Sequence, residues 1–386
     1  MKILEVVEAS GAGVGRHVRS LCQDLITLNH QVTVAYAPHR TDELFRQFVA
    51  DQQNNIRFVP LRVERKISPV SDLQAIIRLL RLIKREGSID VVHGHSSKGG
   101  AIARVAGRWS GIPTVYTPHS LIVASPEISR AEAVVYTLVE RTLGHWATSR
   151  IIAVSNDERE FIVKLGLAPK DHVVVIKNGL DARDLEYSSE GRTCEDFNQK
   201  PLTFGSIMRF STQKAPVNLI EAFIQLLDML PKIPVRLMLA GDGELFPEAK
   251  RLVEESGLGE KIALLGWREN TRDLLRKFDI FVLSSLYEGF SYAVLEAMAA
   301  KLPVVSTDVF GTKETVFQVP GNVLVPSGDP KALAHGMKQI ATLANPGALR
   351  QVLRRIGEAN HSYVLGHFRQ SETTRRTLEV YQALCQ

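Results

Sequence analysis

Residues 280–300 are IFVLSSLYEGFSYAVLEAMAA, and their pattern already indicates the class of fold. Residues 280–283 form an apolar run that is typical of a buried strand. A turn follows at Gly289, and residues 293–300 are then rich in helix-forming side chains. A buried strand, a turn and a helix in direct succession are typical of an α/β fold with a mostly parallel sheet.

The start of this helix has the chemistry of an anion site. The backbone N–H groups of Phe290 and Ser291 are expected to lie unpaired there, where partial positive charge gathers and phosphate binds readily. Glu288 and Glu296 flank the helix start, and their negative charge suits them to sugar hydroxyls rather than to phosphate. The stretch therefore predicts a nucleotide-sugar site. In the alternative interpretation, Glu288 is a loop acid and Glu296 is a solvated helix acid. Two glutamates at this spacing, taken alone, would favour that interpretation.

The same alternation of apolar runs and amphipathic stretches extends along the whole chain of 386 residues, a length that suits two domains. One series occupies residues 1–177 and a second occupies residues 201–365. Between them, residues 178–200 contain an Asn-Gly pair and a charged stretch, which indicates a linker. We expect two Rossmann-like, doubly wound α/β domains that face each other across a cleft, where such folds bind ligands.

The composition excludes several classes of protein. A hydrophobic content of 45% and a charged content of 23% are typical of a globular domain. The three cysteines are scattered, which predicts no disulfide framework and a cytoplasmic location. Acids near the N-terminus disfavour a signal peptide, and no apolar run reaches the ~20 residues of a membrane-spanning helix. The net charge of +5 fits nucleic acid, anionic lipid or phosphorylated substrates equally.

A glycine-rich turn, GAGVG at 11–15, follows the first predicted strand. Gly13 and Gly15 would allow close backbone approach to an anion, so we assign them to donor binding. The G-x-G-x-x-G fingerprint is not matched, and no acid ends the second strand at 31–36, which disfavours a nicotinamide cofactor. We expect no cofactor. The alternative is a turn that needs glycine for packing alone.

Two further strand-end turns carry histidines. The segment HGHSSKGG at 93–100 suggests zinc, but a His-x-His pair lacks a third ligand at diagnostic spacing. We prefer a polar turn in which His95 and Ser96 face the acceptor and Ser96 or Ser97 caps the helix. His119 ends the next strand, where it would contact the sugar or steer a proton, unless it is a structural histidine.

In the second half, the segment MRFSTQK at 208–214 places Arg209 and Lys214 in one strand-end loop. Two cations there would neutralise the charge that grows on a departing diphosphate. Gly266 and Arg268 follow another strand and would contact the base. No Asp-x-Asp motif is present to chelate a divalent ion, so we expect no metal, and no G-x-S-x-G elbow indicates a hydrolase.

Together these motifs resemble the retaining GT-B glycosyltransferases of glycosyltransferase family 4, nearly from end to end. The most specific parts are residues 288–296, the Arg209/Lys214 pair, residues 241–243 and the glycine turn. The resemblance implies that Arg209 and Lys214 hold the diphosphate, that Glu288 contacts the donor sugar and that Glu296 contacts the ribose. It also implies that the last helix, 370–385, crosses back onto the N-terminal domain.

The resemblance implies an activity as well. A sugar would move from a nucleotide diphosphate sugar, with a UDP-sugar favoured over GDP-mannose, to a hydroxyl with retained configuration and without metal. Arg209, Lys214, Glu288 and His119 would be the catalytic residues. Segments 93–100 and 116–120 look like those of bacterial enzymes that extend polyprenyl-diphosphate-linked saccharides for surface polysaccharides, so no nucleic acid partner is expected.

Several features depart from the family pattern and leave alternatives open. Phe210 and Ala215 stand beside the cationic pair where leucine and glycine are common, and Ser291 and Tyr292 replace residues that are often smaller. The donor sugar is therefore not specified. The alternatives are a nucleotide-sugar epimerase of the same fold and a non-catalytic nucleotide-sugar-binding subunit.

The segment 72–85 is both basic and strongly apolar. Its Ile76, Leu79, Leu80 and Ile83 would belong to the core in one interpretation. In the other, its cations face anionic inner-leaflet lipid, each adding ~1 kcal/mol of attraction, and the protein is peripheral on the cytoplasmic face of the membrane. These cations are Arg78, Arg81, Lys84 and Arg85.

Overall fold

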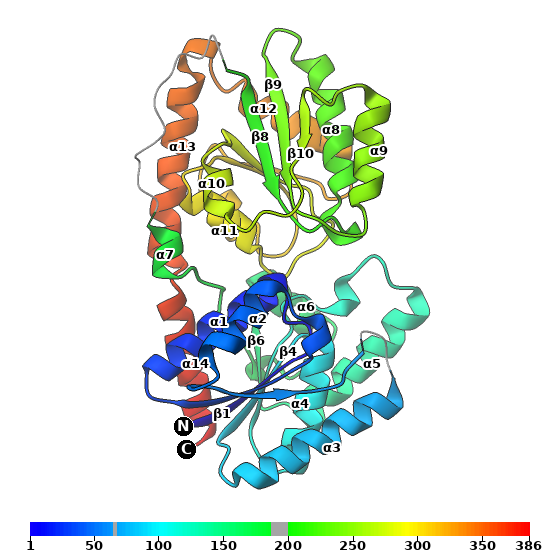
Figure 1. Cartoon of the computed structure of the whole chain (residues 1–386), viewed down its shortest axis with the longest axis vertical. Coiled ribbons are helices and arrows are strands. Elements are labelled where there is room, and N and C mark those ends of the chain that lie inside the picture. The colour runs from blue at the N-terminus through cyan, green and yellow to red at the C-terminus, as the bar shows by residue number, and fades with distance from the viewer. Residues whose placement is uncertain (65–67, 187–199) are drawn as a thin grey trace. The chain divides into compact units, whose positions relative to one another are not determined.

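The structure is a computed structural model that describes residues 1–64, 68–186 and 200–386 (Figure 1). The described chain divides into two compact units, residues 1–179 with 370–386, and residues 180–369. Most of the predicted linker, residues 187–199, lies outside the described residues. Its described part contains the short helix α7 (Ala182–Leu185).

The first unit is built on a seven-stranded parallel sheet with the strand order β3-β2-β1-β4-β5-β6-β7. The order reverses between β1 and β4, and in open α/β sheets the carboxyl ends of the strands at such a switch point bind ligands. The strands are β1 (Lys2–Val7), β2 (Gln31–Tyr36), β3 (Arg57–Pro60), β4 (Val91–His95), β5 (Thr114–Thr117), β6 (Arg150–Ala153) and β7 (Val173–Val175).

Helices cover both faces of this sheet because side chains alternate along a buried strand. Ile3 and Val7 pack with α1, α2 and α14, while Leu4 and Val6 pack with α3 and α4. The α-helices of this unit are α1 (Ala12–Thr27), α2 (Glu43–Gln52), α3 (Pro69–Glu86), α4 (Ser97–Trp109), α5 (Arg130–Trp146), α6 (Asn156–Lys164) and α14 (Gln370–Leu384). Short 3₁₀ helices lie at Pro38–Arg40, Ile122–Ala124 and Lys170–His172.

The last helix, α14, belongs to the first unit although it follows the whole second unit in sequence. It packs against α1, and Tyr381 is fully buried in the same apolar cluster as β1. Thr374 donates a hydrogen bond to Asp24 at 2.6 Å. The C-terminal residues are therefore part of the first unit's core.

The second unit has a six-stranded parallel sheet with the order β10-β9-β8-β11-β12-β13. Its strands are β8 (Leu202–Ile207), β9 (Val235–Ala240), β10 (Ile262–Leu264), β11 (Ile280–Leu283), β12 (Val304–Thr307) and β13 (Val323–Val325). Its other helices are α8 (Pro216–Met229), α9 (Phe246–Ser256), α10 (Thr271–Leu275), α11 (Tyr292–Ala299), α12 (Pro330–Ala341) and α13 (Pro346–His367), with 3₁₀ helices η4 (Thr212–Lys214) and η5 (Val316–Gln318). The switch point lies between β8 and β11.

The predicted fold class, two doubly wound α/β domains of the Rossmann type, is confirmed by the two parallel sheets. The helix at 43–52 was missed, although Asp42 caps it by accepting a hydrogen bond from the Phe45 N–H. After β12, residues 311–315 form a turn that leads directly into η5. No helix in the described ranges is long and apolar enough to cross a membrane.

Candidate active site

In the second unit, two strand-end loops meet through an ion pair. Lys214, at the end of η4, lies after β8, and its Nζ pairs with the Glu288 carboxylate in the loop after β11. Ser285 Oγ donates to Glu288 Oε1 at 2.6 Å. Glu288 is buried, and a buried carboxylate needs a partner for its charge. Lys214 supplies the opposite charge, and Ser285 holds the carboxylate in place.

Three more hydrogen bonds fix the relative position of these loops. The Leu286 N–H donates to the Gln213 carbonyl at 2.8 Å, and Gln213 Nε2 donates to the Tyr287 carbonyl at 3.0 Å. Ser284 Oγ donates to the Lys214 carbonyl at 2.8 Å. Neither Ser284 nor Ser285 was predicted from the sequence to be a site residue. Their position directly after a buried strand could have indicated it.

Helix α11 begins at Tyr292, one residue later than predicted, and Ser291 is its N-cap. The Ser291 side chain makes no capping hydrogen bond. Its Oγ is buried and has no hydrogen-bond partner among the described residues. A buried hydroxyl without a partner costs stability, and this one lies at the start of a helix, where the first backbone N–H groups have no acceptor within the helix. Phe290, by contrast, packs its ring against Phe368 at 5.6 Å.

Arg209 lies in the loop after β8, where its side chain is 63% exposed and pairs with Glu244 at 3.3 Å. The loop rests on the turn at 241–243, because the Phe210 N–H donates to the Asp242 carbonyl at 2.9 Å. A Cβ at Gly241 would lie 1.7 Å from the Met208 carbonyl oxygen, so only glycine fits there. The described contacts do not bring Arg209 to Lys214, and their joint grip on a diphosphate stays a prediction.

The remaining predicted donor residues of this unit lie around the same sheet. Gly266 follows β10, and its carbonyl accepts a hydrogen bond from the Gly241 N–H at 2.9 Å. Arg268 is exposed two residues further on, and Glu296 is half-buried on α11. The structure thus places these residues on loops or helices that follow parallel strands. Their contacts with a base or a ribose stay predictions.

In the first unit, a buried hydrogen-bond network runs across the carboxyl edge of the sheet. His95 Nε2 lies 2.7 Å from Glu5 Oε2, and His95 Nδ1 lies 3.0 Å from His119 Nε2. Tyr381 donates to Glu5 Oε1 at 3.1 Å, and its hydroxyl lies 2.5 Å from His93 Nδ1. Glu5, His93 and His95 are fully buried, and His119 is half-buried.

These contacts fix the direction of the hydrogen bonds when Glu5 is a carboxylate. The carboxylate only accepts, so His95 donates from Nε2, and a His95 ring that carries a single proton accepts at Nδ1. His119 must then donate from Nε2 to His95, which leaves His119 Nδ1 as the acceptor. A hydrogen-bond acceptor at a strand-end loop is suited to a sugar hydroxyl.

Burial keeps the surrounding imidazoles neutral. It lowers the pKa of His17 to about 3, and the adjacent His95 ring lowers it further because two neighbouring rings cannot both carry a charge without repulsion. Burial, followed by the neighbouring histidines, also lowers the pKa values of His93 and His119 well below their ordinary value. Neutral rings accept protons, whereas imidazolium would repel its neighbours here.

This cluster also contains the residues that could hold a metal ion. Nitrogen atoms of His17, His95 and His119 lie within 4.8 Å of one another, as do ligand atoms of Glu5, His93 and His95. His17 Nδ1 is buried without a hydrogen-bond partner in the described part of the chain. A metal bound by the three histidines would, however, replace the hydrogen bond between His95 and His119. The missing third ligand of the His-x-His pair is thus supplied by tertiary contacts.

Ser96 is the N-cap residue of α4, as predicted, but its side chain makes no capping hydrogen bond. Its Oγ donates to Glu8 Oε2 at 2.6 Å, and Glu8 also pairs with Arg40. This charge-assisted hydrogen bond directs the hydroxyl toward the carboxylate. Ser97 is the first helical residue, not the cap.

The glycine turn has a structural explanation. A Cβ at Gly15 would lie 2.0 Å from the Ser10 carbonyl oxygen, and the Gly15 N–H bonds the Gly11 carbonyl at 3.3 Å. Asp42 Oδ2 already accepts a hydrogen bond from the Ala12 N–H at 2.8 Å, so a carboxylate occupies this helix start. Gly13 lies half-buried in the first turn. A donor-binding role for Gly13 and Gly15 stays a prediction.

Backbone strain gathers at these strand-end loops. Ser96, His119 and Ser120 have φ angles of 61°, 60° and 145°, and Ala215, directly after Lys214, has a φ of 48°. Residues other than glycine rarely adopt positive φ angles, and backbone strain of this kind costs of order 1–3 kcal/mol for each residue. Strained residues cluster at functional sites, which supports a functional role for both edges.

Comparison with known proteins gives consistent matches. The family described as Glycosyltransferase Family 4 matches residues 11–184, and the family described as Glycosyl transferases group 1 matches residues 200–342. UDP-Gal:alpha-D-GlcNAc-diphosphoundecaprenol alpha-1,3-galactosyltransferase of Escherichia coli is 32% identical over 265 residues, which are 66% of each chain. The phosphatidylinositol N-acetylglucosaminyltransferase gpi3 subunit of Schizosaccharomyces pombe is 25% identical over 97% of this chain and 78% of its own length.

Solved structures show the same fold. The crystal structure of Anabaena Alr3699/HepE in complex with UDP superposes with a TM-score of 0.77 and covers 99% of this chain and 100% of its own, at 19% identity. A likeness at this identity speaks for the fold alone.

Proposed function

The chain belongs to glycosyltransferase family 4 and has the GT-B fold, and from this premise we propose the details of its reaction. It is a glycosyltransferase that moves a sugar from a UDP-sugar to a saccharide hydroxyl on a polyprenyl-diphosphate carrier. The name of the Escherichia coli relative states a UDP-sugar donor and a diphosphoundecaprenol acceptor, which supports both choices. The UDP in the Anabaena structure is also consistent with a uridine donor.

The observation that carries the donor site is the buried Ser291 hydroxyl without a partner at the start of α11. A phosphate oxygen would accept its proton together with those of the adjacent backbone N–H groups. Lys214 would neutralise the same phosphate from its place beside Glu288, and the exposed Arg209 would add a second cation. Glu288 would bind a donor sugar hydroxyl through an oxygen that Ser285 orients.

On the acceptor side, His119 would accept a hydrogen bond from the attacking hydroxyl through Nδ1. His95 and Glu5 hold His119 in the tautomer that allows this. Ser96, fixed by Glu8, lies in the neighbouring strand-end turn and would contact the saccharide. These residues act as acceptors and orienting groups.

The proposed chemistry is front-face displacement with retention. The bond from the anomeric carbon to the departing phosphate oxygen breaks, the acceptor oxygen forms a new bond to that carbon, and the acceptor proton passes to the phosphate oxygen. Stabilising the departing phosphate is the main catalytic contribution, because oriented donors act strongly in a dry site. The cations and the helix start would make a metal unnecessary.

A lipid-borne acceptor implies that the protein works at a membrane surface, and we propose a peripheral location on the cytoplasmic side. The Schizosaccharomyces pombe relative, which matches over 97% of this chain, favours phosphatidylinositol as a second candidate acceptor. Transfer assays with each lipid class decide between them.

A thermal-shift panel tests the donor assignment, because a bound ligand stabilises the folded form. UDP-sugars are expected to raise the melting temperature more than GDP-sugars. Ser291→Ala is expected to weaken UDP-sugar binding about tenfold. Ser256→Ala is the control and is expected to leave binding unchanged, because the Ser256 hydroxyl donates to the Val253 carbonyl within α9. Equal shifts by all nucleotides, or an inverted product anomer by NMR, would contradict the proposal.

A further inference from the structure

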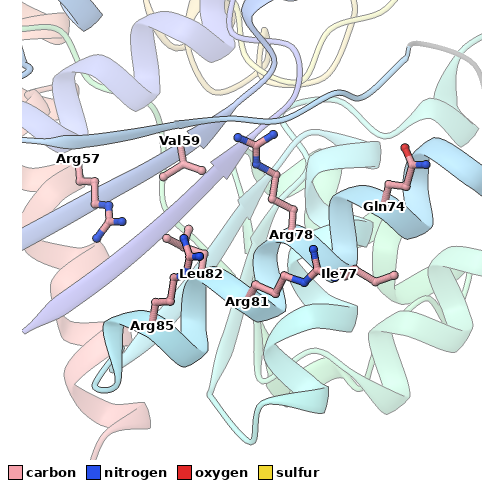
Figure 2. A pocket seen from close by; sticks show the side chains of 8 residues that line it. All are labelled: Arg57, Val59, Gln74, Ile77, Arg78, Arg81, Leu82 and Arg85. Atoms are coloured by element: carbon pink, nitrogen blue, oxygen red, sulfur yellow. The ribbon is translucent and has the colours of Figure 1, made fainter.

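A basic pocket lies on the first unit, away from the histidine network. Its cavity, of about 610 Å³, is bounded by the edge strand β3 and the outward face of α3. Figure 2 shows that Arg57 and Val59 come from the strand, while Arg78, Arg81 and Arg85 come from successive turns of the helix. Four guanidinium groups therefore surround one hollow, and no acidic side chain lines it.

These charges are poorly compensated within the protein. Arg57 pairs with Glu86. Among the described ion pairs, none involves Arg78, Arg81 or Arg85, and all three are exposed. Like charges this close repel one another, so binding an anion would relieve the repulsion. A guanidinium group pairs with phosphate through two parallel hydrogen bonds, which makes phosphate the best-matched anion.

The same helix carries apolar side chains that have no place in the core. Its inner face is buried at Ala75, Leu79, Leu82 and Ile83. Its outer face exposes Val70, Leu73 and Ile77, at 69%, 50% and 37%. These three residues are spaced to share one face of the helix, next to the arginines. Exposed apolar side chains beside a row of cations are typical of a helix that lies in a membrane interface.

A second helix of the first unit exposes more apolar surface. Within α5, five large apolar side chains are exposed by at least 41%, namely Val134, Val135, Leu138, Val139 and Trp146. Helix α4 packs against both α3 and α5, so the three helices lie side by side. Lys98 in the first turn of α4 pairs with Asp72 in the first turn of α3 at 2.9 Å.

The topology places this apolar surface at a specific end of the sheet. Helices α3 and α5 precede the parallel strands β4 and β6, so each helix starts at the carboxyl edge of the sheet. In α3, all three exposed apolar residues lie in the N-terminal half. In α5, Val134 and Val135 lie in the N-terminal half, whereas Trp146 is the last residue of the helix. The residues of the N-terminal halves lie toward the same edge as His95 and His119, which we assign to the acceptor.

We propose that the outward faces of α3 and α5 form a docking surface for an anionic phospholipid bilayer. Headgroup phosphates enter the pocket of Arg57, Arg78, Arg81 and Arg85, and the exposed apolar residues enter the bilayer interface. The docking surface rests on the proposed function in one respect. If the acceptor is lipid-borne, docking at this surface holds it near the histidines. The charge complementarity of the surface is independent of the reaction.

Co-sedimentation of the full chain with vesicles tests the surface. Vesicles with a third of phosphatidylglycerol are expected to bind it, and vesicles of phosphatidylcholine alone to bind it far more weakly. The variant Arg78→Gln/Arg81→Gln/Arg85→Gln is expected to lose about five-fold in affinity for each charge, roughly 100-fold in total. The matched control, Lys250→Gln/Arg251→Gln/Arg276→Gln, removes three exposed cations of the second unit and is expected to bind like the wild type.

Two further arms separate the sources of phosphate and the two proposals. Val134→Ser/Leu138→Ser is expected to weaken vesicle binding while leaving the melting temperature unchanged. If inorganic pyrophosphate binds the wild type but not the triple arginine variant in calorimetry, while both bind anionic vesicles equally, the pocket is a small-anion site and the proposal is wrong. Equal binding to neutral and anionic vesicles also overturns it. Because the UDP-sugar thermal shift is measured without lipid, vesicle binding without that shift rejects the proposed function and keeps the surface.

Discussion

The carboxyl edges of the two sheets have the same parallel α/β architecture but carry different side chains. In the first unit, His95, Glu5 and His93 are fully buried, and each is hydrogen-bonded to a neighbour. In the second unit, Arg209 is largely exposed and Lys214 is partly so. One edge presents buried groups held by hydrogen bonds, and the other presents cations that reach the surface.

Under the proposed function, this difference suits the two edges to two ligands. A hydroxyl needs an acceptor of fixed orientation, and a buried network supplies that orientation. A diphosphate binds best to cations and a helix start, which need not be buried to attract it. The strands set where the loops lie, and the loop residues set what they bind.

The strongest test of this contrast removes charge from the second edge. Lys214→Met is expected to lower kcat/KM by about 10²–10³, because the departing phosphate loses a cation and Glu288 loses its partner. Release of nucleoside diphosphate measures the rate. Lys313→Met, which removes a half-exposed cation paired with Asp308, is the control and is expected to be near wild type. A wild-type rate for Lys214→Met would place the diphosphate elsewhere.

A smaller effect is expected when the first edge loses its orientation. Glu5→Gln puts an amide where His95 and Tyr381 both donate, so one donor loses its acceptor and the His119 tautomer is no longer fixed. We expect kcat to fall about tenfold with a shifted pH profile and unchanged binding of the UDP-sugar. Tyr381→Phe, which keeps the ring, is expected to cost less. A rise in the donor Kd with an unchanged pH profile would assign Glu5 a structural role only.

The contrast should also appear in the pH dependence of stability. The unfolded chain protonates His17 at its ordinary pKa of ~6.5, while burial lowers the folded pKa to about 3. Stability therefore falls as the pH drops below 6.5, by roughly 1.4 kcal/mol per pH unit for this group. His17→Gln is expected to remove that slope in urea titrations at pH 7 and pH 5. The exposed His335→Gln should leave the slope as it is.

The smallest effect is expected from metal removal. Because His95 and His119 use their facing nitrogens in a hydrogen bond, EDTA is expected to change the transfer rate by less than about twofold. Zinc titration followed by calorimetry checks whether the three histidines bind an ion. A rate that EDTA abolishes and zinc restores, but not in His17→Gln, would make the first edge a metal site.

The sequence predicted the class of fold because the apolar periodicity of strands and helices is local. It also placed the site residues at strand ends, since each motif follows an apolar run, as Lys214 and Ser291 do. It missed α2, a short helix that buries Phe45 and Phe48 alone. It also assigned the hydroxyl of Ser96 to a helix cap, because a competing carboxylate 88 residues away leaves no local signal.

The amino-acid sequence by itself determined the alternating elements, the two series of strands and the residue types at each turn, since these depend on neighbours within a few positions. The tertiary structure alone decided which of those residues meet. It paired Lys214 with Glu288, added His17 to the histidines, and brought Tyr381 to His93 across 288 residues. Such contacts depend on which strands become neighbours and on how helices pack over them, and the burial that follows then lowers the pKa values of the histidines.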